Sequence, residues 1–187
     1  MPDGKRRIAE RELETAIRER RSCRAYRPDP VPDNLIRECV EAARLAPSAC
    51  NKQPWRFYAV SAPDLRKQLC EEALLPGIKM PWLEQAPVIM VLCMKKKLAT
   101  HFLAPLLSGI HYEYIDLGIA GEHFVLAAEE RGLGTCWVGW IKAARAKKIL
   151  DLPFDVTPVS FLSVGYPAEL RDHTGRLPLE EILTFLR

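Results

Sequence analysis

Three arginines and a serine stand close together at Arg20, Arg21, Ser22 and Arg24. If this segment is extended, Arg20, Ser22 and Arg24 project to one side, because successive side chains of a strand alternate between faces. Two guanidinium groups that flank a hydroxyl form a good site for phosphate, since their planar forks donate paired hydrogen bonds. A solvated charge cluster at a helix end, where cations suit the helix dipole, would use the same residues. The segment alone leaves these two interpretations equally open.

A second polar segment runs from Pro47 to Trp55 and carries Ser48, Asn51 and Gln53. Its amide and hydroxyl groups could bind the polar edge of a heteroaromatic ring. The same residue types are common in polar turns, where they cap helices and bond to nearby backbone. Taken by itself, this segment favours the turn.

Glycines bound a third segment, residues 132–139, with the sequence GLGTCWVG. It is not a dinucleotide-binding fingerprint, because GxGxxG would need glycine where the chain has Trp137, and because a helix is expected before it rather than a strand. The sequence also has no GxxxxGKS or GxxxxGKT loop. Arg176, near the C-terminus, is either a further phosphate ligand or a loop cation. Each of these signals is weak when taken singly.

The composition is that of one folded domain. The chain has 187 residues, of which 48% are apolar and 27% charged, which is enough for one packed core and excludes wholesale disorder. The longest apolar run, residues 86–94, is too short to span a bilayer, and the N-terminus has no apolar signal segment. We therefore expect a cytoplasmic protein without a membrane segment.

The net charge of +3 is concentrated at one end, since residues 1–27 hold nine basic and five acidic side chains. A nucleic-acid-binding protein usually has a broader basic face, so a local anion site is the better interpretation. The six cysteines include no CxxC pair and the four histidines include no HExxH spacing. The sequence therefore predicts free thiols and no metal site.

The elements that must position these segments follow from hydrophobic spacing, prolines and glycines. Residues 1–7 are expected to be a tail and 8–187 one domain, with no clean periodicity in 95–109. Gly118 and Gly121 lie inside an almost wholly apolar helix, which predicts close approach of another backbone, a flat ligand or a partner's helix. The fold class is α+β with a mixed sheet. We expect helices at 8–20, between Pro32 and Pro47, and at 63–74, 110–131, 142–150 and 179–186, and strands at 55–61, 88–94, 135–140 and 157–164.

Taken together and in this order, the segments resemble the FMN-dependent nitroreductase family over residues 13–187. That resemblance implies a three-layer sandwich, in which helices flank an antiparallel-centred mixed sheet, and an intertwined homodimer with two sites at its interface. It implies that the FMN phosphate and ribityl chain bind to Arg20, Arg21, Ser22 and Arg24, and that Arg176 is a further phosphate ligand. It also implies that Pro47, Ser48, Asn51 and Gln53 lie against the flavin, commonly that of the other subunit, and that the backbone near Val138 and Gly139 faces the pyrimidine and N5 edge.

The activity implied by the resemblance is a ping-pong reaction. NADH or NADPH reduces FMN, and the flavin then reduces a small electrophilic acceptor such as a nitroaromatic compound or a quinone. No protein acid or base is required, because the flavin carries the chemistry. Trp82 and Phe102 are candidates for lining the acceptor pocket, and Cys50 and Cys136 are either snug small residues or redox-active thiols. The alternative is a non-catalytic, ligand-binding sensor dimer on the same fold.

Overall fold

The computed structural model describes residues 13–95, 109–169 and 174–187. Residues 13–19 form the described part of the first predicted helix. The predicted tail, the start of that helix and Phe102 lie outside the described residues, as does most of the stretch without periodicity.

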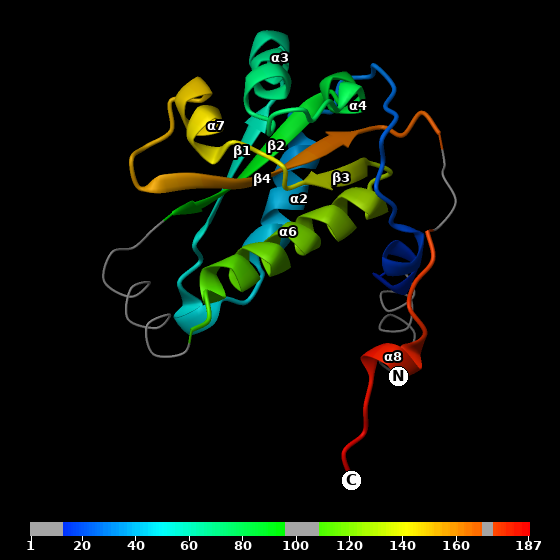
Figure 1. The fold of residues 1–187 in the computed structure, drawn as a ribbon. Coiled ribbons are helices and arrows are strands. Elements are labelled where there is room, and N and C mark those ends of the chain that lie inside the picture. Colours follow the sequence, from blue (N-terminus) through cyan, green and yellow to red (C-terminus); the bar gives the residue numbers. More distant parts are fainter. Residues whose placement is uncertain (1–12, 96–108, 170–173) are drawn as a thin grey trace.

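The centre of the fold is a four-stranded antiparallel sheet with the order β1-β2-β4-β3 (Figure 1). Its strands are β1 (Trp55–Val60), β2 (Val88–Lys95), β3 (Gly134–Val138) and β4 (Val156–Gly165). At the free edge of β3, Ser22 forms an isolated parallel bridge with Thr135. This bridge gives the sheet the mixed character that the sequence predicted.

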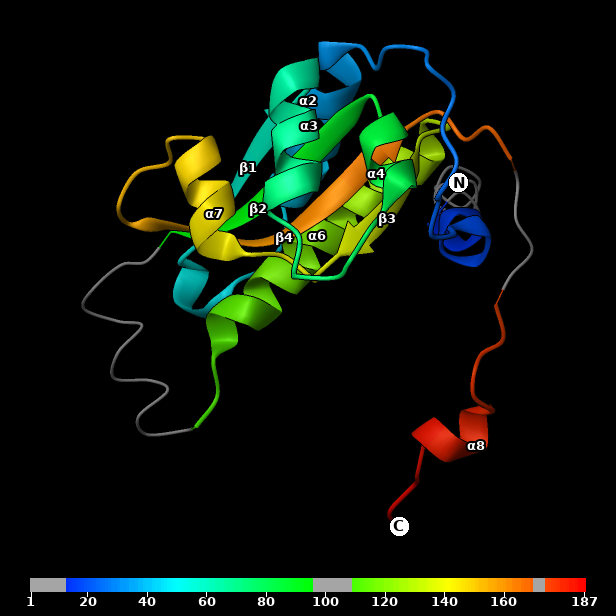
Figure 2. The ribbon, with the colours of Figure 1, turned by 45° about the horizontal axis from the view of Figure 1, so that its top comes forward.

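Helices cover both faces of the sheet, which confirms the predicted three layers (Figures 1 and 2). One face carries α2 (Asp33–Arg44) and α6 (Tyr112–Glu130), and the other carries α3 (Pro63–Glu72), α4 (Pro81–Gln85) and α7 (Ala143–Ile149). Strand β2 is buried on both faces, as predicted, because its side chains alternate between the two cores. Its contributions are Val88, Met90 and Leu92 to the α2–α6 side and Ile89, Val91 and Cys93 to the other.

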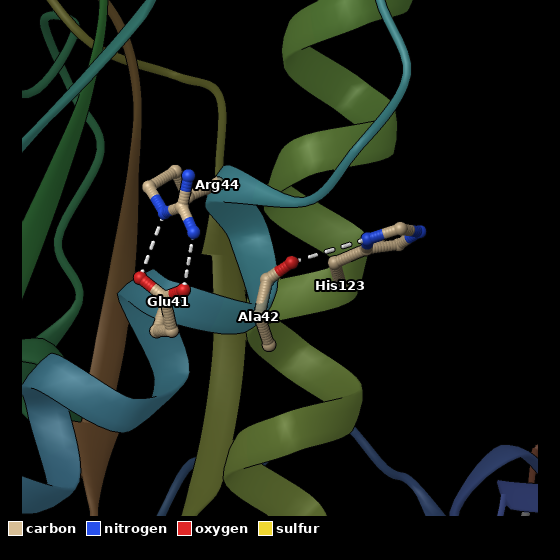
Figure 3. A network of polar contacts seen from close by, with 4 residues as sticks. All are labelled: Glu41, Ala42, Arg44 and His123. Atoms are coloured by element: carbon tan, nitrogen blue, oxygen red, sulfur yellow. Dashed lines mark hydrogen bonds and ion pairs between the residues drawn. The ribbon is translucent and has the colours of Figure 1, made fainter.

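Helices α2 and α6 pack against each other along an apolar stripe of α2 that includes Ile36, Cys39 and Ala43. Figure 3 shows the polar rim of this contact, where Nδ1 of His123 lies 3.3 Å from the carbonyl oxygen of Ala42. A salt bridge between Glu41 and Arg44 covers the outer side of α2. Packing against α2 fixes one side of α6 against the domain and leaves the other side of α6 free.

The two glycines of α6 differ in their surroundings. A Cβ at Gly121 would collide with the indole of Trp137 and lie 2.9 Å from Cδ2 of Leu92, so the predicted close approach exists there, but a side chain makes it. A Cβ at Gly118 would meet nothing within 4 Å in this chain. Packing inside the chain therefore explains why position 121 is glycine, and it does not explain the glycine at position 118.

Most predicted elements end within two residues of the observed ones, as is usual for such boundaries. The final helix is the exception: α8 covers only Leu179–Ile182 instead of 179–186. All residues of 174–187 are exposed, and a short helix without a buried apolar face is unstable. The five-residue helix α4 and the 3-10 turn η1 (Ala49–Asn51) were not predicted.

Candidate functional site

The arginine segment lies along the free edge of β3. Besides the Ser22–Thr135 bridge, the backbone N–H of Cys23 donates to the carbonyl oxygen of Thr135 at 2.8 Å. The segment is extended, as predicted, and runs parallel to β3. After Cys23 the chain leaves β3, because Ala25 and Arg27 form backbone hydrogen bonds with Ala168 and Tyr166, which follow β4.

Two residues that the sequence analysis did not single out hold this segment in place. Gly134 lets it approach, because a Cβ there would lie 2.7 Å from Cβ of Cys23. Tyr26 anchors the far end: its hydroxyl donates to the carbonyl oxygen of Cys23 at 2.8 Å and lies 2.6 Å from Oγ of Ser163. Burial raises the pKa of Tyr26 well above its usual value, so the phenol stays protonated and can donate.

The first two arginines are surrounded by carboxylates. Nε of Arg20 lies 3.9 Å from Oε1 of Glu122 on α6. Burial raises the pKa of Glu129, and the nearby charges of Arg21 and Arg20 oppose that shift. Arg21 donates through Nη1 to the carbonyl oxygen of Glu19, whereas its buried Nε has no hydrogen-bond partner among the described residues. A buried donor without a partner is unusual, and an anionic oxygen would satisfy it.

A small cavity of about 40 Å³ adjoins the segment. Arg21, Ser22 and Arg24 line it, together with the carboxylates of Glu129 and Glu169. The volume suits a few waters or one tetrahedral anion rather than a nucleotide. These carboxylates neutralise part of the arginine charge before any ligand binds.

Arg24 has different neighbours. Arg24 is exposed, and its guanidinium carbon lies 5.9 Å from the ring centre of Trp82. Burial raises the pKa of the Cys136 thiol, while the charge of Arg24 and a hydrogen bond with Ser22 lower it. Cys136 is therefore a buried thiol under the arginine segment, and Arg24 is a cation beside this residue in the middle of β3.

The backbone at the end of β3 is accessible to a ligand. Val138 is buried, whereas Gly139 is exposed, and a Cβ at Gly139 would meet nothing within 4 Å. Gly139 also accepts a hydrogen bond at its carbonyl oxygen from the N–H of Ile141 at 2.9 Å. A flat ring could approach this backbone without meeting a side chain at position 139.

The polar loop that contains η1 is a strained turn held by its own side chains. Cys50, Asn51 and Gln53 have φ values of 50°, 52° and 48°, in the left-handed region that residues other than glycine rarely adopt. Oγ of Ser48 accepts from the N–H of Gln53 at 3.0 Å, and Nε2 of Gln53 donates to Oδ1 of Asn51 at 2.8 Å. The turn interpretation of this loop is thus confirmed, but strain of this kind is concentrated at functional sites.

Asp116 attaches this loop to α6. Its Oδ1 accepts a hydrogen bond from the backbone N–H of Ala49 at 3.0 Å, and the side chain is only 5% exposed. The sequence placed Asp116 on a polar stripe of the helix. A carboxylate buried in an apolar helix is costly unless it has a partner, and this requirement could have identified Asp116 from the sequence.

The structure does not bring all the predicted site residues together. The polar loop meets α6 at Asp116, and Arg21 meets it at Glu129, which lies about 20 Å further along the helix axis at 1.5 Å per residue. Arg176 lies in the exposed C-terminal segment, which extends away from the sheet (Figures 1 and 2). Its Nη1 donates to the carbonyl oxygen of Thr174 at 3.0 Å. Pro47 stays with the loop, so the predicted site residues of one chain fall into separate groups.

Known proteins share the sequence pattern and the fold of this chain. The sequence profile of the Nitroreductase family matches residues 17–75 and 71–166. The chain belongs to this family. A protein of Thermus thermophilus named NADH dehydrogenase is 32% identical over 92% of this chain and 95% of its own length. A protein of Bacillus subtilis named FMN reductase [NAD(P)H] is 31% identical over 91% of this chain and 72% of its own.

Solved structures of nitroreductase-family proteins share the fold. The NfrA2 protein of B. megaterium superposes with a TM-score of 0.81 at 30% identity, covering 92% of this chain and 73% of its own. The predicted family and fold class are therefore confirmed. The relatives' names support the predicted FMN-dependent oxidoreductase chemistry with NADH or NADPH as the donor.

Two negative findings apply to the described part of the chain. None of its helices is long and apolar enough to cross a membrane. It holds no group of three or more histidine, cysteine, aspartate or glutamate side chains that could bind a metal ion.

Proposed function

We propose that this nitroreductase-family chain is a homodimeric, cytoplasmic FMN oxidoreductase that takes electrons from NADH or NADPH and reduces small electrophilic acceptors, such as nitroaromatic compounds or quinones. One observation supports it above the others: the arginine segment runs parallel to β3. In this arrangement Arg20 and Arg21 precede the bridge to Thr135, where a phosphate would bind, and the backbone of Gly139 after the strand is open to a ring. Residues 8–187 would form one FMN-binding domain, with residues 1–7 as a tail.

The residues present fit FMN by their chemistry. Arg20, Arg21 and Ser22 would bind the phosphate, because guanidinium and hydroxyl groups are its natural donors and Nε of Arg21 has no protein partner in the described structure. Arg24 would lie beside the ring and stabilise negative charge on it. Backbone groups of Val138 and Gly139 would face the polar edge of the ring. Bound FMN would supply the transfer of electrons from the nicotinamide to the acceptor.

The other half-site would come from the partner subunit. Pro47, Ser48, Asn51 and Gln53 would lie against the partner's flavin, since this loop is too far along α6 to reach the arginine segment of its own chain. Arg176 would complete the phosphate site from the C-terminal segment. The chain itself would hold ligands in place and exclude water, without a side chain that transfers protons.

The surface supports a dimer. The exposed C-terminal segment carries six large apolar side chains, which are costly to leave in water. They are Leu177, Leu179, Ile182, Leu183, Phe185 and Leu186. Tyr114 and Ile115 are half exposed on the free side of α6, beside the open surface at Gly118. A second copy of the chain would cover both surfaces. Sedimentation equilibrium should give a dimer mass at micromolar concentration, and a monomer mass would contradict the proposed assembly.

The test of the function is the visible absorption spectrum of the purified protein, before and after anaerobic addition of NADH or NADPH. We expect a flavin band that bleaches and then returns when a quinone or nitroaromatic compound is added. A band that NADH and NADPH both leave unchanged would exclude these donors and favour a flavin-binding sensor. A protein that shows no flavin band even after incubation with FMN would refute the proposal.

A further inference from the structure

The three arginines of the segment are held in different ways. Arg20 lies near a carboxylate, that of Glu122 at 3.9 Å. The exposed Arg24 has no carboxylate within 4.0 Å among the described residues and lies over the indole of Trp82 instead, with 5.9 Å from its guanidinium carbon to the ring centre. An aromatic ring attracts a cation through its quadrupole and carries no net charge. The indole therefore orients Arg24 without neutralising it.

Trp82 is well placed to act as a fixed platform. It packs against a buried cluster formed by Cys23, Tyr26 and Ala86. Cys23 and Tyr26 belong to the chain on either side of Arg24, so Trp82 touches the backbone region of the arginine segment as well as the guanidinium. Helix α4 itself is fastened to α3, because Arg66 donates through Nη1 to the carbonyl oxygens of Glu84, at 3.1 Å, and Ala86.

The position of Arg24 along β3 determines what its contact with Trp82 can do for a bound flavin. Arg24 lies beside Cys136 of β3, because its charge and a hydrogen bond act on that thiol, whereas Arg20 and Arg21 lie near Glu122 and Glu129 of α6. Of the three arginines, Arg24 is therefore the one placed along β3 toward the open backbone at Gly139. A cation there stabilises an anionic ring more than a neutral one. Reduced FMN is the more negative of the two redox states, so an Arg24 held beside the ring would raise the reduction potential of the flavin.

We propose that Trp82 is a positioning residue of the flavin site, whose indole holds the Arg24 guanidinium beside the ring. The proposal rests on the proposed function only in that FMN binds along β3. It assigns a role to α4, a helix that supplies no predicted ligand of the flavin.

The test compares three single variants in the purified protein. Trp82→Leu removes the ring, and Trp82→Phe keeps a smaller one. Tyr166→Leu is the matched control, because Tyr166 makes an equivalent contact at 5.1 Å with Arg27, which is outside the predicted flavin ligands. Two quantities are measured: the dissociation constant of FMN from the apoprotein by quenching of flavin fluorescence, and the midpoint potential of the bound flavin.

We expect Trp82→Leu to weaken FMN binding about two- to fivefold, the size of one exposed cation–π contact, and to make the midpoint potential more negative. Trp82→Phe should retain most of both values, and Tyr166→Leu should change neither. In an Arg24→Met background, Trp82→Leu should cause no further change in the potential, because the group that it positions is gone. Loss of packing alone would lower the melting temperature without this pattern.

The outcomes separate the two proposals. A wild-type protein that binds no FMN overturns both. A wild-type protein that binds FMN, with a Trp82→Leu variant of unchanged potential or with an equal shift in the Arg24→Met background, overturns only the role of Trp82. If Trp82→Leu does not fold, Trp82→Phe is compared in the wild-type and Arg24→Met backgrounds instead. A shift of the potential that is equal in the two backgrounds counts against the role.

Discussion

Gly134 controls how closely the arginine segment can approach β3. A Cβ at this position would lie 2.7 Å from Cβ and 2.8 Å from Sγ of Cys23, and 2.9 Å from Cγ of Pro167. All three atoms belong to short or cyclic side chains, which cannot move far without moving their backbone. Gly134→Ala should therefore push the segment outward from the strand edge.

The magnitude combines two opposing effects. Overpacking of this kind costs about 1–3 kcal/mol. Alanine in a strand interior regains about 0.5–1 kcal/mol relative to glycine. We expect a net loss of about 1–2 kcal/mol in the free energy of unfolding, which lowers the melting temperature of the apoprotein by about 2–8 °C. Losing one charge-assisted hydrogen bond to the phosphate should also weaken FMN binding about tenfold or more.

Val60→Ala provides the control. Val60 is 5% exposed in β1, the opposite edge of the sheet, and its truncation should cost a similar 1–2 kcal/mol. The assay is thermal unfolding of both apoproteins by circular dichroism, followed by titration with FMN. Both variants should melt earlier, and only Gly134→Ala should lose affinity for FMN. If Gly134→Ala binds FMN as tightly as Val60→Ala does, the approach at Gly134 does not position the arginines.

Three further predictions concern other parts of the molecule. Asp116→Ala should lower the free energy of unfolding by about 1–3 kcal/mol and speed tryptic cleavage after Lys52, because the N–H of Ala49 loses its acceptor. Asp116→Asn should lower it by less. Equal cleavage rates for the two variants would count against this prediction. Arg20→Met should weaken FMN binding about tenfold or more in a fluorescence titration while leaving the melting temperature of the apoprotein nearly unchanged. Burial raises the pKa of the Cys93 thiol from 9.0 to about 12, so the folded state keeps a proton that the unfolded chain releases, and this contribution is complete below pH 9 and lost as the pH rises toward 12. Between pH 9 and 11, stability to urea should therefore fall less steeply in Cys93→Ala than in the wild type, by at most about 1.4 kcal/mol per pH unit, and equal slopes would refute the assignment.

The sheet and the long helix could be predicted because their sequences have one dominant pattern. The apolar run 88–94 allows only a doubly buried element, and β2 is buried on both faces. The apolar residues of 110–131 demand burial on several sides, and α6 lies between the sheet, α2 and the proposed partner. The extended form of the arginine segment followed from the prolines after it and from the alternation of Arg20, Ser22 and Arg24.

Other features of the structure depend on tertiary contacts that no local sequence pattern predicts. Helix α4 has five residues, too few for a period, and it is held by Arg66 from another helix. The left-handed backbone of Cys50 and Asn51 carries no glycine that would have indicated it. The hydrogen bond of Asp116 to Ala49 could not be predicted, because the loop that covers this side chain is distant in sequence. In each case tertiary contacts outweighed local preference.

The separation of the two half-sites along α6 has a consequence for how this chain must work. A flavin enzyme needs no catalytic side chain of its own, so its activity depends on how accurately cations and backbone groups surround the ring. One chain offers arginines near Glu122 and Glu129 and a strained amide loop at Asp116, at different turns of the same helix. A second copy that packed against the free side of α6 would bring the loop of one chain toward the arginines of the other. Dimerisation would then be a condition of flavin binding, and substitutions on the exposed side of α6 should weaken FMN affinity without touching any flavin ligand.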